Sequence, residues 1–132
     1  MERILLDTSG YAAFKRNVPV ALEIIRSVEY IGVNVVVLGE LLGGFKGGNR
    51  ERKNIEELNK FLDSPRVYVL QIDEETAEFY AKIYWDLKRK GKPIPSNDMW
   101  VAASAIRHGL SLFTLDEHFK NIDSLILKET SF

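Results

Sequence analysis

Cysteine is absent from this sequence, and histidine occurs only at His108 and His118. Without cysteine there are no disulfides, no thiolate zinc sites and no cysteine nucleophiles. Two histidines are too few for a histidine-based metal site. This residue usage is typical of a protein that works in a reducing compartment, so we expect a cytoplasmic localisation.

Long hydrophobic runs and an excess of one charge are missing as well. The longest apolar run, VVVLGELLGGF at 35–45, is short and carries a glutamate, so we expect no membrane span. We expect no signal segment either, because Met1 leads almost directly into a strand. The formal net charge of −1 gives no global attraction for nucleic acid. A role with nucleic acid therefore requires local basic patches or a bridging metal.

Strand-like and helix-like segments alternate along the 132 residues, which we expect to form one domain over 1–132. Strands are predicted at 3–6, 32–38, 66–72 and 110–115, with a short last one at 125–130. Helices are predicted at 10–15, 19–28, 50–64, 74–90 and 98–108, with a helical turn at 116–122. The alternation predicts an α/β fold, a three-layer α/β/α sandwich around a central parallel sheet.

Several residues are predicted to begin or end these helices. Ser9 is a plausible N-cap for the first helix, and Ser96 or Asn97 for the helix at 98–108. Asp73 is predicted to cap the long helix at 74–90, and Gly91 to end it. The five glycines of 39–49 predict a short helix followed by a mobile loop.

Acidic residues recur where the predicted strands end. Asp7 follows the first strand directly, Glu40 lies two residues beyond the second, and Asp116 comes just after the fourth. Asp98 lies in the first turn of the helix that leads to the fourth strand. In open parallel sheets, binding sites form beyond the carboxyl ends of the strands. We therefore expect the four carboxylates to face one crevice.

Four carboxylates in one crevice repel one another, and this repulsion is expected to raise the pKa of at least one of them. A divalent cation offsets the repulsion, and an oxygen-only ligand set suits magnesium or manganese. Simpler interpretations exist, since Asp98 can complement a helix dipole and Asp116 can cap a turn. Asp7 is different because Ser9 is available as the cap, so a metal ligand at Asp7 should point away from its helix.

Four segments resemble those of the PIN-domain nucleases: LLDTS at 5–9, GELLGG at 39–44, SNDMWVAASAIRHG at 96–109 and LFTLDEHF at 112–119. Their order and spacing are similar to those of the VapC-type toxins of toxin–antitoxin modules. The resemblance implies a parallel α/β/α sandwich with a magnesium- or manganese-dependent ribonuclease site. It also implies an RNA substrate, a cognate antitoxin protein and a homodimer.

The resemblance gives the four acids a catalytic role: Asp7, Glu40, Asp98 and Asp116. We expect the metal to be bound directly by Asp7 and Asp98, and through water by Asp116. Glu40 is expected to orient water or to complete a second metal position. The side chains expected to hydrogen-bond these carboxylates are Thr8, Ser9, Asn97 and Thr114. His118 departs from the pattern, since many relatives carry an acidic or polar residue there.

Two basic clusters are candidates for contact with RNA. The segment FKGGNRERK at 45–53 is the better one because it follows Glu40 and is rich in glycine, and the residues expected to touch RNA are Lys46, Arg50, Arg52 and Lys53. The second cluster, KRKGK at 88–92, is typical of a helix end, where basic side chains complement the dipole. For the homodimer, Phe14, Ile55 and Phe61 are candidates for either the interface or the core.

Three other functions stay open from the sequence. The first is a PIN-domain nuclease that processes RNA outside toxin–antitoxin systems. The second is a receiver-like signalling domain, which is disfavoured because the first strand offers one acid and no lysine ends the fourth strand. The third is a binding module that has kept the fold and lost activity, which the intact set of acids disfavours.

Overall fold

The computed structural model describes residues 2–130. Within them, one parallel sheet is built from the strands β1 Arg3–Leu6, β2 Tyr30–Asn34, β3 Val67–Leu70 and β4 Ser111–Phe113. The strand order is β3-β2-β1-β4, so β1 lies inside the sheet. Its apolar residues Ile4, Leu5 and Leu6 are fully buried, as is typical of a parallel strand covered on both faces. The carboxyl ends of all these strands lie at one edge of the sheet.

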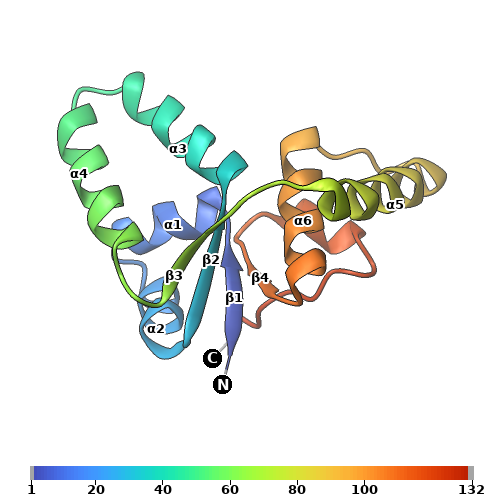
Figure 1. Ribbon diagram of the computed structural model, residues 1–132, viewed down its shortest axis with the longest axis horizontal. Helices are drawn as coiled ribbons and strands as arrows, with labels where there is room; N and C mark the ends of the chain where they lie inside the picture. Colours follow the sequence, from blue (N-terminus) through green and yellow to red (C-terminus); the bar gives the residue numbers. More distant parts are fainter. Residues whose placement is uncertain (1, 131–132) are drawn as a thin grey trace.

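Helices cover both faces of the sheet (Figure 1). The helices α1 to α4 lie on one side, with α3 extending past the sheet edge, and α5 and α6 lie on the other. Their bounds are α1 Thr8–Lys15, α2 Pro19–Ser27, α3 Val35–Lys46, α4 Glu51–Leu62, α5 Glu74–Lys90 and α6 Ser96–His108, and a 3₁₀ helix, η1, covers Glu117–Asn121. The predicted α/β class with helices on both sides of a parallel sheet is confirmed. Within residues 2–130, no helix combines the length and the hydropathy needed to span a membrane.

Glycine at position 10 allows α1 to begin tightly against the sheet. A Cβ atom at Gly10 would lie 2.8 Å from Leu6 Cδ1 and 3.0 Å from the carbonyl oxygen of Phe113. Leu6 and Phe113 are register partners on β1 and β4, so the first turn of α1 packs on the ends of both strands. Asp7, between β1 and α1, is thereby held at the carboxyl edge of the sheet.

The second strand is shorter than the sequence predicts. Instead of running over 32–38, β2 ends at Asn34 and α3 begins at Val35. The Asn34 side chain accepts a hydrogen bond from the Val36 amide and donates one to Ser104 Oγ. This cap outweighs the weak strand preference of the valines that follow. The helix then continues through Gly43 and Gly44, so the predicted mobile loop is confined to the turn between α3 and α4.

Other boundaries also differ from the prediction. The strands β3 and β4 are shorter than the segments 66–72 and 110–115, and the strand predicted at 125–130 is reduced to an isolated bridge between Leu112 and Leu127. By contrast, α5 begins and ends as predicted. The Asp73 carboxylate accepts a hydrogen bond from the Thr76 amide, and Gly91 adopts a left-handed conformation with φ of 67° at the helix end.

The candidate interface residues pack mainly within the chain. Phe14 and Phe61 have ring centroids 5.7 Å apart, and both rings contact Tyr11, which is buried. This aromatic cluster joins α1 to α4. Ile55 is half-buried on α4. Phe14 and Phe61 are half-buried in this cluster, and the homodimer stays a proposal.

Candidate active site

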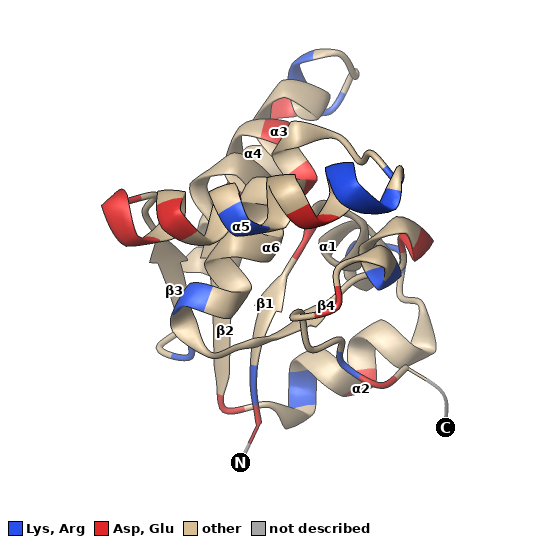
Figure 2. Cartoon of the chain, turned by 90° about the vertical axis from the view of Figure 1, so that its right-hand side faces the viewer, with Lys and Arg blue, Asp and Glu red and all other residues tan. Residues whose placement is uncertain are grey.

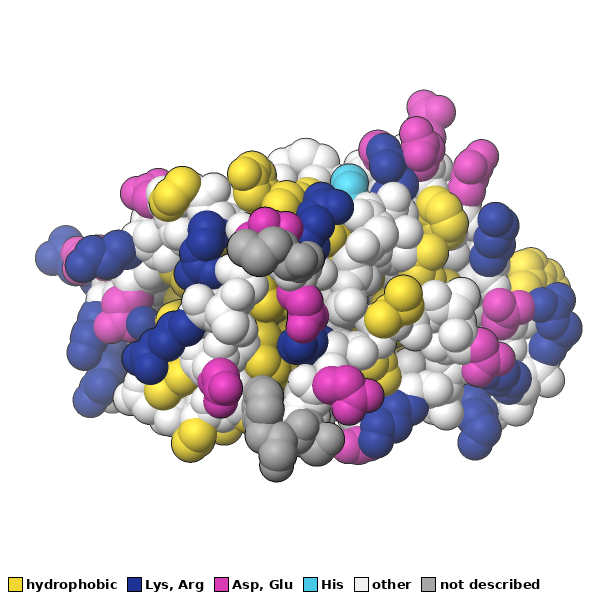
Figure 3. All heavy atoms as spheres, turned by 90° about the horizontal axis from the view of Figure 1, so that it is seen from below, with side chains coloured by type: hydrophobic (Ala, Val, Ile, Leu, Met, Phe, Trp, Pro, Cys, Tyr) yellow, Lys and Arg dark blue, Asp and Glu magenta, His cyan; other side chains and the backbone are white. Residues whose placement is uncertain are grey.

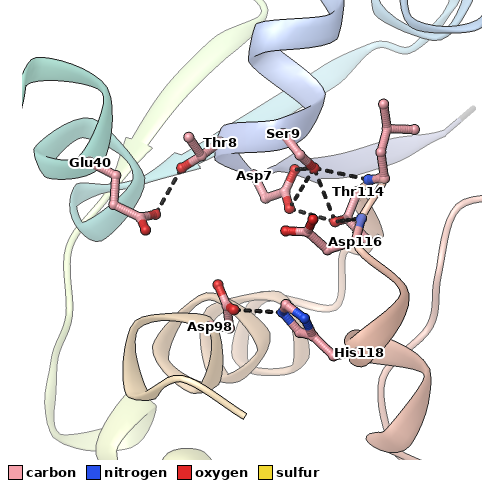
Figure 4. Close-up of polar contacts among 9 residues, drawn as sticks. Asp7, Thr8, Ser9, Glu40, Asp98, Thr114, Asp116 and His118 are labelled. Carbon is pink, nitrogen blue, oxygen red and sulfur yellow. Dashed lines mark hydrogen bonds and ion pairs between the residues drawn. The ribbon is translucent and has the colours of Figure 1, made fainter. Parts of the chain in front are cut away.

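A pocket of about 340 Å³ opens at the carboxyl edge of the sheet, where the predicted crevice lies. It is lined by all four acids, which come from different segments of the chain. Asp7 follows β1, Glu40 belongs to α3, Asp98 lies in the first turn of α6, and Asp116 precedes η1. Figure 4 shows the four side chains around a common space. Asp7 and Asp98 thus share one pocket, as the sequence predicts.

Asp7 is held by a set of donors around its carboxylate. Its Oδ1 accepts hydrogen bonds from the Gly10 amide at 2.7 Å and from Ser9 Oγ at 2.8 Å, and its Oδ2 accepts one from Thr114 Oγ1. Burial raises the pKa of Asp7 above 3.8, while these hydrogen bonds lower it and the charge of Asp116 raises it slightly. The side chain is only 4% exposed. A buried carboxylate with so many donors is fixed in one orientation.

Two predictions about Asp7 were wrong. Asp7 itself caps α1, and Ser9 lies inside the helix, where its hydroxyl bonds Asp7 instead of a helix amide. Asp7 was expected either to cap its helix or to face the pocket, and it does both. A carboxylate has two oxygens and several lone-pair directions, so one backbone amide does not saturate it.

Within residues 2–130, the Asp98 carboxylate has one side-chain partner, His118. The distance from Asp98 Oδ2 on α6 to His118 Nε2 on η1 is 2.6 Å, and the two residues are 20 positions apart in the sequence (Figure 4). Burial raises the pKa of Asp98, and the hydrogen bond and charge of His118 oppose this effect. The charges of Glu40 and Asp116 contribute a smaller increase. The predicted repulsion among the acids is therefore present, but burial is the larger cause of both raised pKa values.

Glu40 and Asp116 complete the acidic lining. Glu40 Oε1 accepts a hydrogen bond from Thr8 Oγ1 at 2.8 Å, which ties α3 to the start of α1. Asp116 stands at the N-cap position of η1, but its side chain caps no amide there. Its own amide donates to Thr114 Oγ1 at 3.0 Å, so Thr114 links the backbone of Asp116 to the carboxylate of Asp7. The carboxylate of Asp116 is left to face the pocket.

The predicted supporting residues are placed unevenly. Thr8, Ser9 and Thr114 hydrogen-bond the acids as expected. Asn97 lines the pocket without a hydrogen bond from its side chain within residues 2–130, and Pro95 rather than Ser96 or Asn97 precedes α6 as its N-cap. His118 is the supporting residue that the prediction missed. Because His118 lies two residues after Asp116, its position in the sequence could have indicated a side chain near the acids.

The donor chemistry of the pocket fits a hard divalent cation. Its acidic and hydroxyl side chains offer oxygen atoms, which magnesium and manganese prefer. In the part of the chain that is described, no three of these side chains stand close enough together to ligate one ion. Magnesium commonly binds through one or two carboxylates and keeps several waters. The pocket offers four carboxylates from which such a pair could come.

The basic residues predicted to touch RNA lie away from the pocket. Lys46 ends α3 and pairs with Glu51 at 3.2 Å. The others are exposed at the turn into α4 or in its first turn: Arg50, Arg52 and Lys53. None of them lines the acidic pocket within the described residues. They lie around the turn between α3 and α4, and only Lys46 shares a helix with Glu40.

The chain belongs to the PIN-domain family, whose model matches residues 4–125. Ribonuclease VapC1 of Rickettsia felis is 38% identical to it over 96 residues, which cover 70% of this chain and 71% of that protein. Ribonuclease VapC4 of Mycobacterium tuberculosis is 33% identical over 88 residues, covering 67% and 68% of the two chains. The fold is similar to that of VapBC2 from Rickettsia felis bound to a DNA fragment from its promoter, with a TM-score of 0.82, 26% identity and coverage of 95% and 96%.

Proposed function

We propose that this protein is a metal-dependent endoribonuclease and the toxin of a VapBC-type toxin–antitoxin module. The observation that carries the proposal is the set of four carboxylates, from four segments of the chain, around one pocket. Membership of the PIN-domain family and the similarity to ribonucleases of the VapC type support it. The proposed cofactor is Mg²⁺ or Mn²⁺, which the oxygen donors of the pocket suit.

Asp7 and Asp98 are the proposed direct ligands. Asp7 is fixed by Gly10, Ser9 and Thr114, and Asp98 by His118. Asp116 would join them through water. When bound, the cation would lower the pKa of a water and neutralise charge on the phosphoryl oxygens of the substrate.

Glu40 is the proposed residue that receives the proton of the attacking water or orients that water. Thr8 already fixes one of its oxygens, so the other is available for a water molecule in the pocket. A carboxylate held in place by a neighbouring donor needs no reorganisation when the reaction begins. The cleaved phosphodiester would lie between Glu40 and the Asp7–Asp98 pair.

The proposed partners follow from the same class of protein. Several similar structures are complexes of a toxin with its antitoxin, including VapBC-1 from Haemophilus influenzae and VapBC2 from Rickettsia felis. We propose a cognate antitoxin that covers the acidic pocket, with an arginine paired to its carboxylates. We also propose that the toxin acts on RNA in the cytoplasm and forms a homodimer.

A cleavage assay tests this proposal. The purified protein is incubated with single-stranded RNA and Mg²⁺ or Mn²⁺, with and without excess EDTA. Asp98→Asn should reduce the cleavage rate by more than about 100-fold, because it removes a charge that holds the cation. Loss of a residue that only hydrogen-bonds a metal ligand typically costs roughly 10- to 100-fold. Asp63→Asn is the matched control, since Asp63 is exposed at the end of α4. Full cleavage in EDTA, or by Asp98→Asn, would overturn the metal mechanism.

Expression in a bacterial host separates the toxin from an RNA-processing nuclease. The wild-type chain alone should arrest growth, and the product of a neighbouring antitoxin gene should relieve the arrest. Asp98→Asn should be harmless. A protein that cleaves RNA in vitro but does not affect growth would favour the processing nuclease.

A further inference from the structure

The second half of α5 exposes two large aromatic side chains that the acidic pocket does not use. Tyr84 and Trp85 are 42% and 55% exposed. Their rings meet edge to face, with centroids 5.9 Å apart. Lys88 Nζ lies 5.7 Å from the Tyr84 centroid and 5.3 Å from the Trp85 centroid. Contiguous exposed apolar groups mark interaction sites in soluble proteins, so this pair of rings is a candidate binding surface.

The same half of α5 is strongly basic. From residue 82 to residue 92 there is a single acid, Asp86, among five basic residues: Lys82, Lys88, Arg89, Lys90 and Lys92. Figure 2 shows the acidic residues at the start of α5 and the basic ones at its end, and hydrophobic and basic side chains adjoin at the right-hand end of Figure 3. A helix dipole accounts for basic residues in the last turn. It does not account for the exposed rings one turn earlier.

This surface is connected to the acidic pocket by the segment 93–99. A hollow of about 390 Å³ beside α5 is lined by Tyr84 and Lys88 on one side and by Pro93, Ile94 and Met99 on the other. The intervening residues Pro95, Asn97 and Asp98 line the acidic pocket. The segment 93–99 therefore lines both the hollow beside α5 and the acidic pocket. A polynucleotide that leaves the pocket over this stretch would arrive at the ring of Tyr84, which meets the ring of Trp85 edge to face.

We propose that Lys82, Tyr84, Trp85, Lys88 and Lys92, here called the α5 platform, bind single-stranded RNA next to the cleavage pocket. The proposal rests on the ribonuclease function proposed above. Bases stack on Trp85 and Tyr84, and phosphates pair with the lysines, which is the general mode of single-strand binding. Lys88 then moves from the rings to a phosphate, because a base occupies its place over them.

Charge favours RNA over a second copy of this chain as the occupant. A symmetric contact between two copies places the same patch on both sides. Two α5 platforms would then bring their lysines close together. The single acid of this stretch, Asp86, is already paired with Arg89 and offsets little of the repulsion. An RNA backbone carries the opposite charge.

Binding of a fluorescein-labelled single-stranded RNA of about 12 nucleotides, followed by anisotropy in EDTA, tests the proposal without cleavage. Trp85→Ala should weaken binding about five-fold or more, because a stacked base is lost. Its matched control is Ile126→Ala, which shortens another exposed apolar side chain, 67% exposed. Lys88→Ala should reduce the slope of log K against log salt by about 0.7, the value for one phosphate contact with a single strand. Its control is Arg26→Ala, an exposed cation on α2.

The outcomes separate this proposal from the ribonuclease function. If wild-type protein cleaves RNA but Trp85→Ala and Lys88→Ala bind it as the wild type does, the α5 platform is not an RNA surface and the ribonuclease function stands. If wild-type protein neither binds nor cleaves RNA, both are overturned. Sedimentation of the same variants measures their oligomeric state and so tests the other occupant considered, a second copy of this chain. A dimer that Trp85→Ala converts to monomer, with RNA binding unchanged, would assign the platform to self-association.

Discussion

Three of the four pocket carboxylates are held by neighbouring side chains, and Asp116 faces the pocket without such a partner within residues 2–130. Asp7 is bonded by Ser9 and Thr114, Glu40 by Thr8, and Asp98 by His118. These contacts orient Asp7, Glu40 and Asp98 separately, before any cation is present. The pocket is therefore organised for binding although the acids themselves repel one another.

Asp7→Asn should stabilise the metal-free protein at neutral pH. Burial raises the pKa of Asp7 above 3.8 in the folded state. Below the unfolded-state pKa of about 4, Asp7 is protonated in both states and does not affect the free energy of unfolding. As the pH rises toward and through the folded-state pKa, the buried carboxylate lowers the free energy of unfolding. Each unit by which the pKa is raised corresponds to about 1.4 kcal/mol. The asparagine amide still offers an oxygen to the Gly10 amide.

Urea unfolding in EDTA measures this effect at neutral pH and again near pH 4. The stability gain of Asp7→Asn should be largest at neutral pH and should shrink toward the acid value. A variant that is less stable than wild type at neutral pH would show that the carboxylate charge stabilises the folded protein even without a cation.

His118→Ala should weaken metal binding without unfolding the protein. Asp98 loses the partner that fixes one of its oxygens, and loss of an outer-shell partner of this kind lowers metal affinity roughly 10-fold or more. Calorimetric titration with Mn²⁺ measures the affinity directly. His118→Gln, which keeps a donor, should restore part of it. Lys120→Ala is the control because Lys120 lies on the same 3₁₀ helix and is exposed. Tighter binding by His118→Ala would mean that His118 competes with the cation for Asp98.

At the scale of the elements, the junction between β2 and α3 decides where Glu40 lies. Because α3 begins at Val35, Glu40 sits on a helix that rises from the sheet edge and reaches Thr8. The junction depends on Asn34, which is fully buried and joins α3 to α6 through Ser104. A change at Asn34 therefore affects both the helix start and the packing of the helix that carries Asp98.

Asn34→Ala should destabilise the protein by about 2 to 4 kcal/mol. It removes the cap of α3, typically about 1 kcal/mol, and leaves the buried hydroxyl of Ser104 without its donor, about 1 to 3 kcal/mol. Ser104→Ala is the matched control, because it removes the second interaction and keeps the cap. Thermal or urea unfolding should rank wild type above Ser104→Ala and Ser104→Ala above Asn34→Ala. Equal stability of the two variants would contradict a role for the cap.

The sequence predicts the sheet and the acids well because both follow from local patterns. Apolar segments of strand length mark the strands, and Asp7 and Asp116 follow two of them directly. The helix start at Val35 is not visible in this way, since a run of valines has the composition of a strand. The contact between Asp98 and His118 depends on how η1 packs on α6, which no local pattern encodes.

At the scale of the whole molecule, three charged regions bear on the binding of RNA. The acidic pocket lies at the carboxyl edge of the sheet, the basic turn between α3 and α4 lies to one side of it, and the basic end of α5 lies to the other (Figure 1). With a net charge of −1, long-range attraction for RNA is weak, so binding depends on these local surfaces. A strand of RNA bound to both basic regions would cross the acidic pocket between them. There a bound cation would offset the repulsion between the RNA phosphate and the carboxylates.

The most direct test is a crystal structure of the protein soaked with Mn²⁺, with anomalous data collected at the manganese absorption edge. We expect a peak in the acidic pocket with metal–oxygen distances of about 2.1 Å to Asp7 and Asp98. Asp98 should move toward Asp7 while Ser9 and Thr114 keep their places, since they fix Asp7 and not Asp98. The Asp98→Asn crystal, soaked in the same way, should lose the peak. An ordered pocket without anomalous density in the wild-type crystal, or a peak bound elsewhere, would contradict a metal-dependent active site built on these acids.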